Sequence, residues 1–217
     1  MMKSVFLIGD SIRLGYERYV AAMLEGVAEV YSPKNVNAGM AQFVQRWLHV
    51  WKQNEGVPDD VEVVHWNAGL WDVLRIYGDD TFTSPEFYAE TLEKIVKRMK
   101  MIFPKATLVF ALSTAVIEER YLGDEYKRYN ADIEKFNEIA IRTLTPYGVV
   151  FNDLYSITKN APESCYSDPT HFNTLDGIKL VGNQVVNCIC EKIGVDRESL
   201  AEKEAELFEI PERILCN

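Results

Sequence analysis

Two short segments of this chain carry the residue types that can activate a hydroxyl group as a nucleophile. The sequence reads Gly-Asp-Ser-Ile at 9–12 and Asp-Pro-Thr-His at 168–171. A carboxylate three positions before an imidazole can accept a hydrogen bond from one ring nitrogen while the other ring nitrogen faces a serine. We therefore expect Ser11 to be a nucleophile, His171 its general base, and Asp168 the residue that orients the imidazole.

Each segment has a simpler interpretation when it is taken alone. Asp or Ser before an apolar helix is commonly only an N-cap, and Asp-Pro is typical of a turn. The chain has three histidines, of which His49 falls in an amphipathic segment and His65 in an apolar run, where packing roles are expected. Cys165 is a rival nucleophile, but no helix start or second histidine accompanies it. His171 therefore remains the best candidate for a base.

The elements that must position these residues alternate along the chain. Short apolar runs, typical of parallel strands covered on both faces, occupy 5–8, 27–31, 61–66, 107–112 and 149–151. Segments with helical spacing lie at 12–24, 43–51, 87–102, 126–144 and 174–189. This alternation predicts an α/β fold with a five-stranded parallel sheet. We expect one domain over 1–217, with 197–217 as a charged surface segment whose first part, 197–208, is helical.

The two longest irregular segments of the sequence, 69–85 and 154–173, each follow a predicted strand. Right-handed crossovers place such loops at the carboxyl edge of a parallel sheet, where ligands bind. Loops of this length in a compact domain are more often functional than idle. The chemistry should therefore converge at this edge.

Composition narrows the classes of partner. The net charge is −10 and the cationic residues are dispersed, which argues against nucleic acid. No apolar run is long enough for a membrane span, and the run at 5–8 is too short for a signal-peptide core, so we expect no membrane partner and a cytoplasmic location. The cysteines lack the spacing of metal or redox motifs, and we expect reduced thiols at Cys165, Cys188, Cys190 and Cys216.

The two segments at 9–12 and 168–171 together resemble the first and last sequence blocks of the SGNH (GDSL-like) hydrolase family. The order Ser, Asp, then His three residues later is the family's order, and the resemblance covers nearly the whole chain. It implies a three-layer α/β/α sandwich with a flavodoxin-like parallel sheet. It also implies an ester hydrolase that works through an acyl-serine intermediate without a metal or organic cofactor.

The resemblance further implies an oxyanion hole made of the Ser11 amide, a glycine after the second strand and an asparagine after the third. Gly39, in the segment 35–39 after the second strand, is our candidate glycine, and the alternative is that Asn35 or Asn37 faces the site instead. The third block departs from the family's Gly-x-Asn-Asp pattern: alignment of Gly69 with it would put Trp71 at the asparagine position, whereas Asn67 could donate from a shifted position. We favour Asn67, because an indole at that place has little freedom to aim its N–H.

The residues near these segments that could line a substrate pocket are Asp10, Trp66, Trp71 and Tyr166. By analogy with the family, the expected substrate is a small-molecule or carbohydrate acyl ester, with acetyl as the acyl group. Two other functions remain open. One is a non-catalytic flavodoxin-like module that binds a phosphate-bearing ligand at the Ser11 helix terminus. The other is a hydrolase fold that has lost catalysis and binds carbohydrate. The sequence gives no indication of oligomeric state.

Overall fold

The structure is a computed structural model that describes residues 2–215, so Cys216 lies outside the described residues. A five-stranded parallel sheet forms its centre, in the order β2-β1-β3-β5-β7. Its strands are β1 (Lys3–Ile8), β2 (Ala28–Tyr31), β3 (Val63–Trp66), β5 (Thr107–Ala111) and β7 (Val150–Asn152). The predicted fold class is confirmed, strand by strand.

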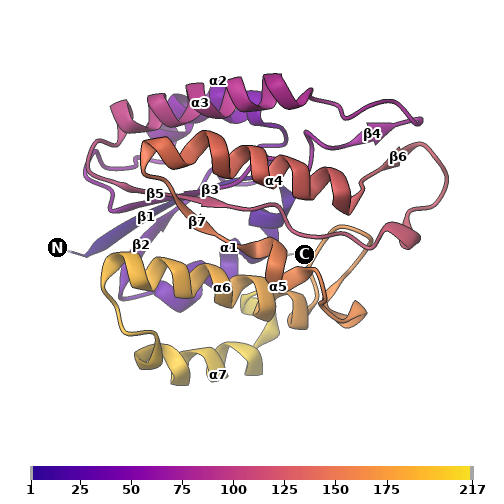
Figure 1. Cartoon of the computed structure of the whole chain (residues 1–217). Helices are drawn as coiled ribbons and strands as arrows, with labels where there is room; N and C mark the ends of the chain where they lie inside the picture. Colours follow the sequence, from indigo (N-terminus) through magenta and orange to yellow (C-terminus); the bar gives the residue numbers. More distant parts are fainter. Residues whose placement is uncertain (1, 216–217) are drawn as a thin grey trace.

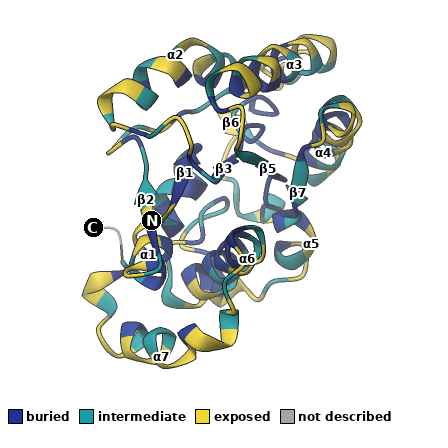
Figure 2. Ribbon diagram, turned by 90° about the vertical axis from the view of Figure 1, so that its left-hand side faces the viewer, coloured by how far each residue is buried: buried dark blue, intermediate teal, exposed yellow. Residues whose placement is uncertain are grey.

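Helices cover both faces of this sheet (Figure 1). One face carries α2 (Ala41–Asn54), α3 (Pro85–Ile102) and α4 (Asn130–Leu144), and the other carries α1 (Ser11–Leu24) and α6 (Leu175–Ile193). The central strands are buried while the outer helix faces are exposed (Figure 2), which explains why the strands are apolar without alternation.

Short polar side chains fix where the helices begin. Asp10 caps α1 by accepting from Ile12 N–H at 2.9 Å. Ser84 caps α3, which starts with a proline. Thr174 caps α6 by accepting from Gly177 N–H at 3.0 Å. Each cap satisfies an amide that would otherwise lack an intrahelical partner. The cap on α1 fixes the position of Ser11, the first residue of that helix.

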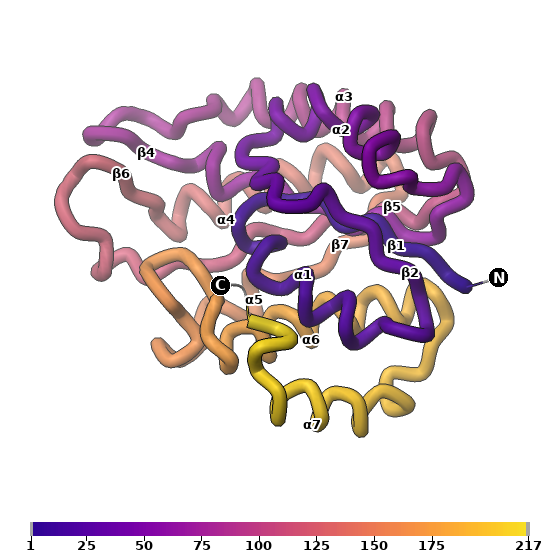
Figure 3. Tube along the Cα trace, turned by 180° about the vertical axis from the view of Figure 1, so that it is seen from behind, coloured from indigo at the N-terminus to yellow at the C-terminus, as the bar shows by residue number. Residues whose placement is uncertain are grey.

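The structure differs from the sequence-based expectation around residue 126. The helix expected over 126–144 begins only at Asn130, because β6 (Tyr126–Lys127) pairs antiparallel with β4 (Arg75–Ile76). An Arg75–Asp132 ion pair of 2.8 Å ties this two-stranded ribbon to α4. Figures 1 and 3 show the ribbon beyond the carboxyl ends of the central strands, at the end of the sheet where α1 begins.

The other long segment, 154–173, is partly ordered into α5 (Leu154–Thr158) and a 3₁₀ turn at Glu163–Cys165. The carboxyl-terminal segment contains α7 (Ala201–Glu209), which packs on α1 through the buried Leu207 and through a Phe208–Tyr19 ring contact of 5.5 Å. In the part of the chain that the structure describes, no helix combines the length and apolarity that crossing a bilayer requires.

Candidate active site

A continuous hydrogen-bonded line joins the two sequence segments. His171 Nε2 lies 2.7 Å from Ser11 Oγ, and His171 Nδ1 lies 2.6 Å from Asp168 Oδ2. Ser11 is held at the amino terminus of α1, directly after β1, whereas Asp168 and His171 come from the loop before α6. The structure therefore brings together three residues that are distant in sequence, since Ser11 and His171 are 160 positions apart.

Local backbone contacts aim the carboxylate of Asp168. Its Oδ1 accepts from Thr170 N–H at 2.7 Å and from His171 N–H at 2.9 Å, which leaves Oδ2 for the imidazole. The loop is held on its other side by Ile117 N–H, which donates to Pro169 O at 2.9 Å. These contacts fix the ring orientation that a general base requires.

The pKa of Asp168 reflects two opposing effects. Partial burial raises the pKa, but the Thr170 N–H and the His171 ring and N–H hydrogen bonds outweigh it, so the pKa lies below its ordinary value. The carboxylate therefore stays ionised at neutral pH and can hold the Nδ1 proton. Ser11, at the positive end of α1, also has a backbone N–H with no acceptor inside the helix.

The turn that carries Ser11 depends on a glycine. A Cβ at Gly9 would collide with the side-chain oxygen of Asn67, which lies against this position. Asn67 is only 5% exposed, and its Oδ1 is buried with no partner among the described residues. The side-chain oxygen of Asn67 thus faces the Gly9 turn that carries Ser11. The role of Asn67 as an oxyanion donor stays a prediction.

Three of the four expected pocket residues are buried elsewhere. Asp10 is fully buried as the cap of α1, and Trp66 is fully buried with its ring against Phe110. Tyr166 is 7% exposed and donates its hydroxyl to Thr158 O at 3.1 Å. None of the three lines the cleft beside Ser11. The reason is that aromatic side chains at a strand end or loop pack into the core when the sheet is covered there.

Trp71, the fourth expected pocket residue, does line this cleft. The cleft has a volume of about 490 Å³, and Ser11, His171, Leu74, Tyr121 and Arg128 contribute to its walls. Leu74 lies in the segment 69–85, which the sequence placed at this edge, whereas Tyr121 and Arg128 flank β6, which the sequence did not connect with the site. Their contribution depends on the ribbon, for which the sequence has no periodic signal.

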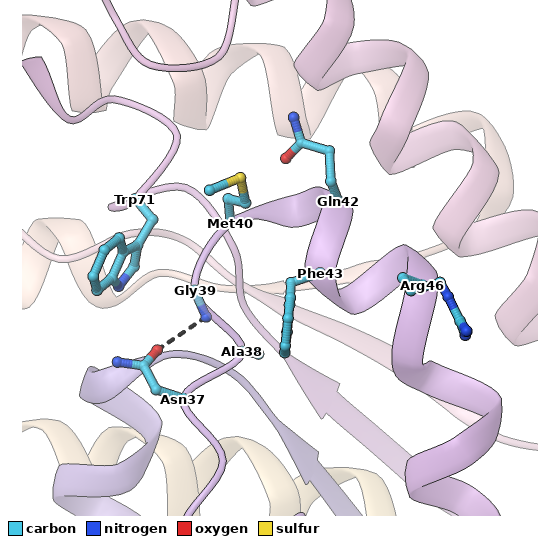
Figure 4. Close-up of a pocket in the computed structure, with 8 residues that line it drawn as sticks. All are labelled: Asn37, Ala38, Gly39, Met40, Gln42, Phe43, Arg46 and Trp71. Carbon is cyan, nitrogen blue, oxygen red and sulfur yellow. Dashed lines mark hydrogen bonds between the residues drawn. The ribbon is translucent and has the colours of Figure 1, made fainter.

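A second cavity, of about 370 Å³, also has Trp71 in its wall, and Figure 4 shows the residues that line it. Gly39, Met40 and Phe43 are among its walls. Gly39 has a positive φ of 56° and an N–H that donates to Asn37 Oδ1 at 2.9 Å. Its α-carbon faces the Trp71 ring, since a Cβ there would lie 4.0 Å from Trp71 Cγ. Gly39 and Trp71 thus lie close together in the wall of this second cavity.

Asp72 anchors the loop that presents Trp71. It is buried and accepts from Thr83 Oγ1 at 2.9 Å and from Ala41 N–H at 3.1 Å. Burial raises its pKa to about 7, although these two hydrogen bonds oppose the shift. Gly69, at the start of the same loop, has a φ of 149° and would drive a Cβ into Ser113. Both features support the alignment of Gly69 and Asp72 with the third block, with Trp71 at the asparagine position.

His65 and Cys165, the other side chains that could act as a base or a nucleophile, are both buried. His65 is fully buried between Tyr16 and Asn152, and this burial lowers its pKa to about 4. Cys165 is 4% exposed, and burial raises the pKa of its thiol. Within residues 2–215 no group of three or more His, Cys, Asp or Glu side chains is placed to hold a metal ion.

Comparison with family models and with curated proteins gave no match. Comparison with solved structures did. A lipase/acylhydrolase from Enterococcus faecalis superposes with a TM-score of 0.68 at 17% identity, over 90% of this chain and 98% of that one. A GDSL-like lipase from Bacteroides thetaiotaomicron gives 0.66 at 14% identity, over 87% and 88%. An acetyl xylan esterase gives 0.62 at 16% identity, over 86% and 99%. The fold is therefore the one found in GDSL-like lipases and esterases.

Proposed function

We propose that this protein is a serine ester hydrolase of the SGNH (GDSL-like) type. The observation that carries the proposal is the Ser11–His171–Asp168 line, with both of its bonds at 2.7 Å or less, opening into a cleft at the carboxyl edge of the sheet. The fold shared with lipases and esterases supports it. Fold likeness alone would not indicate a function, because one fold hosts many activities.

The reaction follows from the geometry. His171 Nε2 removes the Ser11 Oγ proton as Oγ bonds to the ester carbonyl carbon, and the protonated ring then gives that proton to the departing alcohol. Asp168 stabilises the imidazolium and keeps its tautomer fixed. A water molecule, deprotonated by His171, then attacks the acyl-serine and releases the acid and free Ser11.

The tetrahedral intermediate needs donors for its oxyanion. We assign the free Ser11 N–H and the Gly39 N–H, the latter once Asn37 releases it. For the third donor we replace Asn67 with the indole N–H of Trp71, because Trp71 borders both Ser11's cleft and Gly39. Each such donor commonly contributes a factor of roughly 100 to 1,000 in kcat.

For the substrate we propose a small acyl group, acetyl first, on a carbohydrate or another small alcohol. The acetyl xylan esterase among the structural neighbours and the two cavities around Trp71 support this class. Each cavity is of a size that suits a small ligand, so acyl group and alcohol can occupy different ones.

Covalent labelling with a fluorophosphonate probe tests the proposal. The wild-type chain should be labelled at Ser11, and Ser11→Ala should abolish both labelling and hydrolysis of p-nitrophenyl acetate. His171→Ala should slow hydrolysis by roughly 1,000-fold or more, since the residues act as a unit. Ser199→Ala, at an exposed serine, is the matched control and should behave as wild type. A folded wild-type protein that neither reacts with the probe nor cleaves the ester would point instead to a binding module.

A further inference from the structure

Arg128 is a buried cation in the wall of the Ser11 cleft. It follows β6 directly, is 7% exposed, and lines the cleft together with Ser11 and His171. Arginine is seldom buried without a partner, because desolvating its charge is costly. The partners of Arg128 therefore decide whether its role is structural.

The protein holds Arg128 in place but leaves the outer part of its guanidinium free. Nε donates to Leu70 O at 2.5 Å, and the guanidinium carbon lies 5.9 Å from the centroid of the Trp71 ring. Among the described residues neither terminal nitrogen has a hydrogen-bond or ion-pair partner. The other buried arginine, Arg13, is different, since its terminal nitrogens bond to Glu17 and to backbone carbonyls.

The carboxylates near the cleft do not neutralise Arg128. Asp168 is engaged by His171 and by two backbone N–H groups. Glu125, which also lines the cleft, is exposed and lies outside ion-pair distance of Arg128 within the described part of the chain. Among the described residues Arg128 is thus an unpaired positive charge, in a chain whose net charge is −10. A chain with this net charge does not attract anions from a distance, so Arg128 can favour an anion only by direct contact within the cleft.

We propose that the cleft accepts an ester that carries an anionic group, and that this group pairs with the terminal nitrogens of Arg128. This inference rests on the proposed esterase function and specifies its substrate class. A planar fork anchored through Nε presents two parallel N–H groups, the arrangement that binds a carboxylate, phosphate or sulfate in bidentate fashion. The neighbouring Leu74, Ile76 and Tyr121 supply an apolar remainder of the wall.

Matched esters that differ only in charge test this inference. On the acyl side the pair is 4-nitrophenyl hydrogen glutarate and 4-nitrophenyl valerate. On the alcohol side it is 4-acetoxybenzoate and 4-acetoxybenzamide, with 4-acetoxyphenyl phosphate as the phosphate arm. In at least one set the anionic ester should have the higher kcat/KM by roughly 10- to 100-fold, the usual effect of a charge-assisted bidentate contact.

The readout is the ratio of kcat/KM for the anionic ester to that for its neutral partner. Arg128→Gln should bring this ratio close to one, because any loss from a disturbed loop affects both esters and cancels. Arg142→Gln, at an exposed arginine of α4, removes the same charge and should keep the wild-type ratio. A ratio that is equal in wild type and Arg128→Gln for every set overturns the inference.

Binding separates this inference from the proposed function. Ser11→Ala titrated calorimetrically with the same esters should bind the anionic member roughly 10-fold more tightly, and Ser11→Ala/Arg128→Gln should lose that preference. If the wild type hydrolyses no ester but the preference in binding persists, hydrolysis fails and the anion site stands. If neither member binds, or both bind equally, the anion site is wrong.

Discussion

The position of the loop that carries Asp168 and His171 can be tested by substitution of Gly177. Gly177 lies in the first turn of α6, where the helix packs against the loop that ends in Asp168 and His171. A Cβ at this position would lie 2.8 Å from Phe172 O and closer still to Cys165 O. Ordinary carbon–oxygen contacts begin at about 3.3 Å. Gly177→Ala must therefore displace the loop backbone by more than about 0.5 Å, and on the order of 1 Å at Cys165.

Two measurable losses should follow from this displacement. Overpacking against backbone commonly costs about 1–3 kcal/mol of unfolding free energy, of which the better helix propensity of alanine recovers up to about 1 kcal/mol. A misplacement of about 1 Å between base and nucleophile can lower the rate by roughly 100-fold. We therefore expect Gly177→Ala to remain folded at 25 °C, to be less stable in urea, and to lose kcat more than it changes KM.

Urea unfolding and p-nitrophenyl acetate kinetics on the same preparations measure both losses. Glu191→Ala, on the exposed side of α6, is the control, since its side chain is 72% exposed and should change neither quantity much. Without a clash, the change from glycine to alanine in a helix should raise stability by up to about 1 kcal/mol, so a variant more stable than wild type would refute the steric argument, whatever the activity. Lowered stability with unchanged kcat would show that the loop position does not control Ser11 and His171.

Two further predictions concern the third sequence block. The raised pKa of Asp72, about 7 against an ordinary value near 3.9, means that the folded state holds a proton which the unfolded state has released between about pH 4 and 7. Asp72 should therefore lower the free energy of unfolding, by on the order of 2–4 kcal/mol, as pH rises through that window, whereas His65, whose pKa burial lowers to about 4, acts in the opposite direction. The test is therefore a difference between variants: from about pH 4.5 to 8 the change in unfolding free energy measured with urea should be more negative by this amount in wild type and Asp60→Asn than in Asp72→Asn, and equal changes in all three would contradict it. In ester kinetics, Trp71→Phe should lower kcat by roughly 100-fold with little effect on KM, whereas Asn67→Ala should mainly lower stability; the reverse pattern would restore Asn67 as the donor.

The sheet and its helices were predictable because their signals are local. Continuous apolar runs such as 5–8 and 107–112 are typical of strands covered on both faces, and the segments between them have helical spacing. The pair of segments at 9–12 and 168–171 was enough to suggest three side chains that the structure then brings within hydrogen-bond distance.

What the sequence could not predict depends on contacts between distant residues. β4 and β6 are two residues long each, too short for any periodic pattern, and Arg75 and Asp132 are 57 positions apart. The side-chain oxygen of Asn67 occupies the space that a Cβ at Gly9 would fill, and the spacing of residues along the sequence does not indicate this contact. Arg128 falls in a segment that has helical spacing, and only the carbonyl of Leu70 and the Trp71 ring make it a cleft residue.

The separation of Ser11 from His171 has a consequence for the timing of the chemistry during synthesis. Ser11 leaves the ribosome before His171, which follows 160 positions later. β1 must also wait for its second neighbour, because it lies between β2 and β3, and β3 is made well after it. Contacts this distant in sequence form slowly. A chain that ends before His171 therefore carries a Ser11 without its hydrogen-bond partner, and the line from Ser11 to Asp168 forms only once the sheet has brought the two segments together.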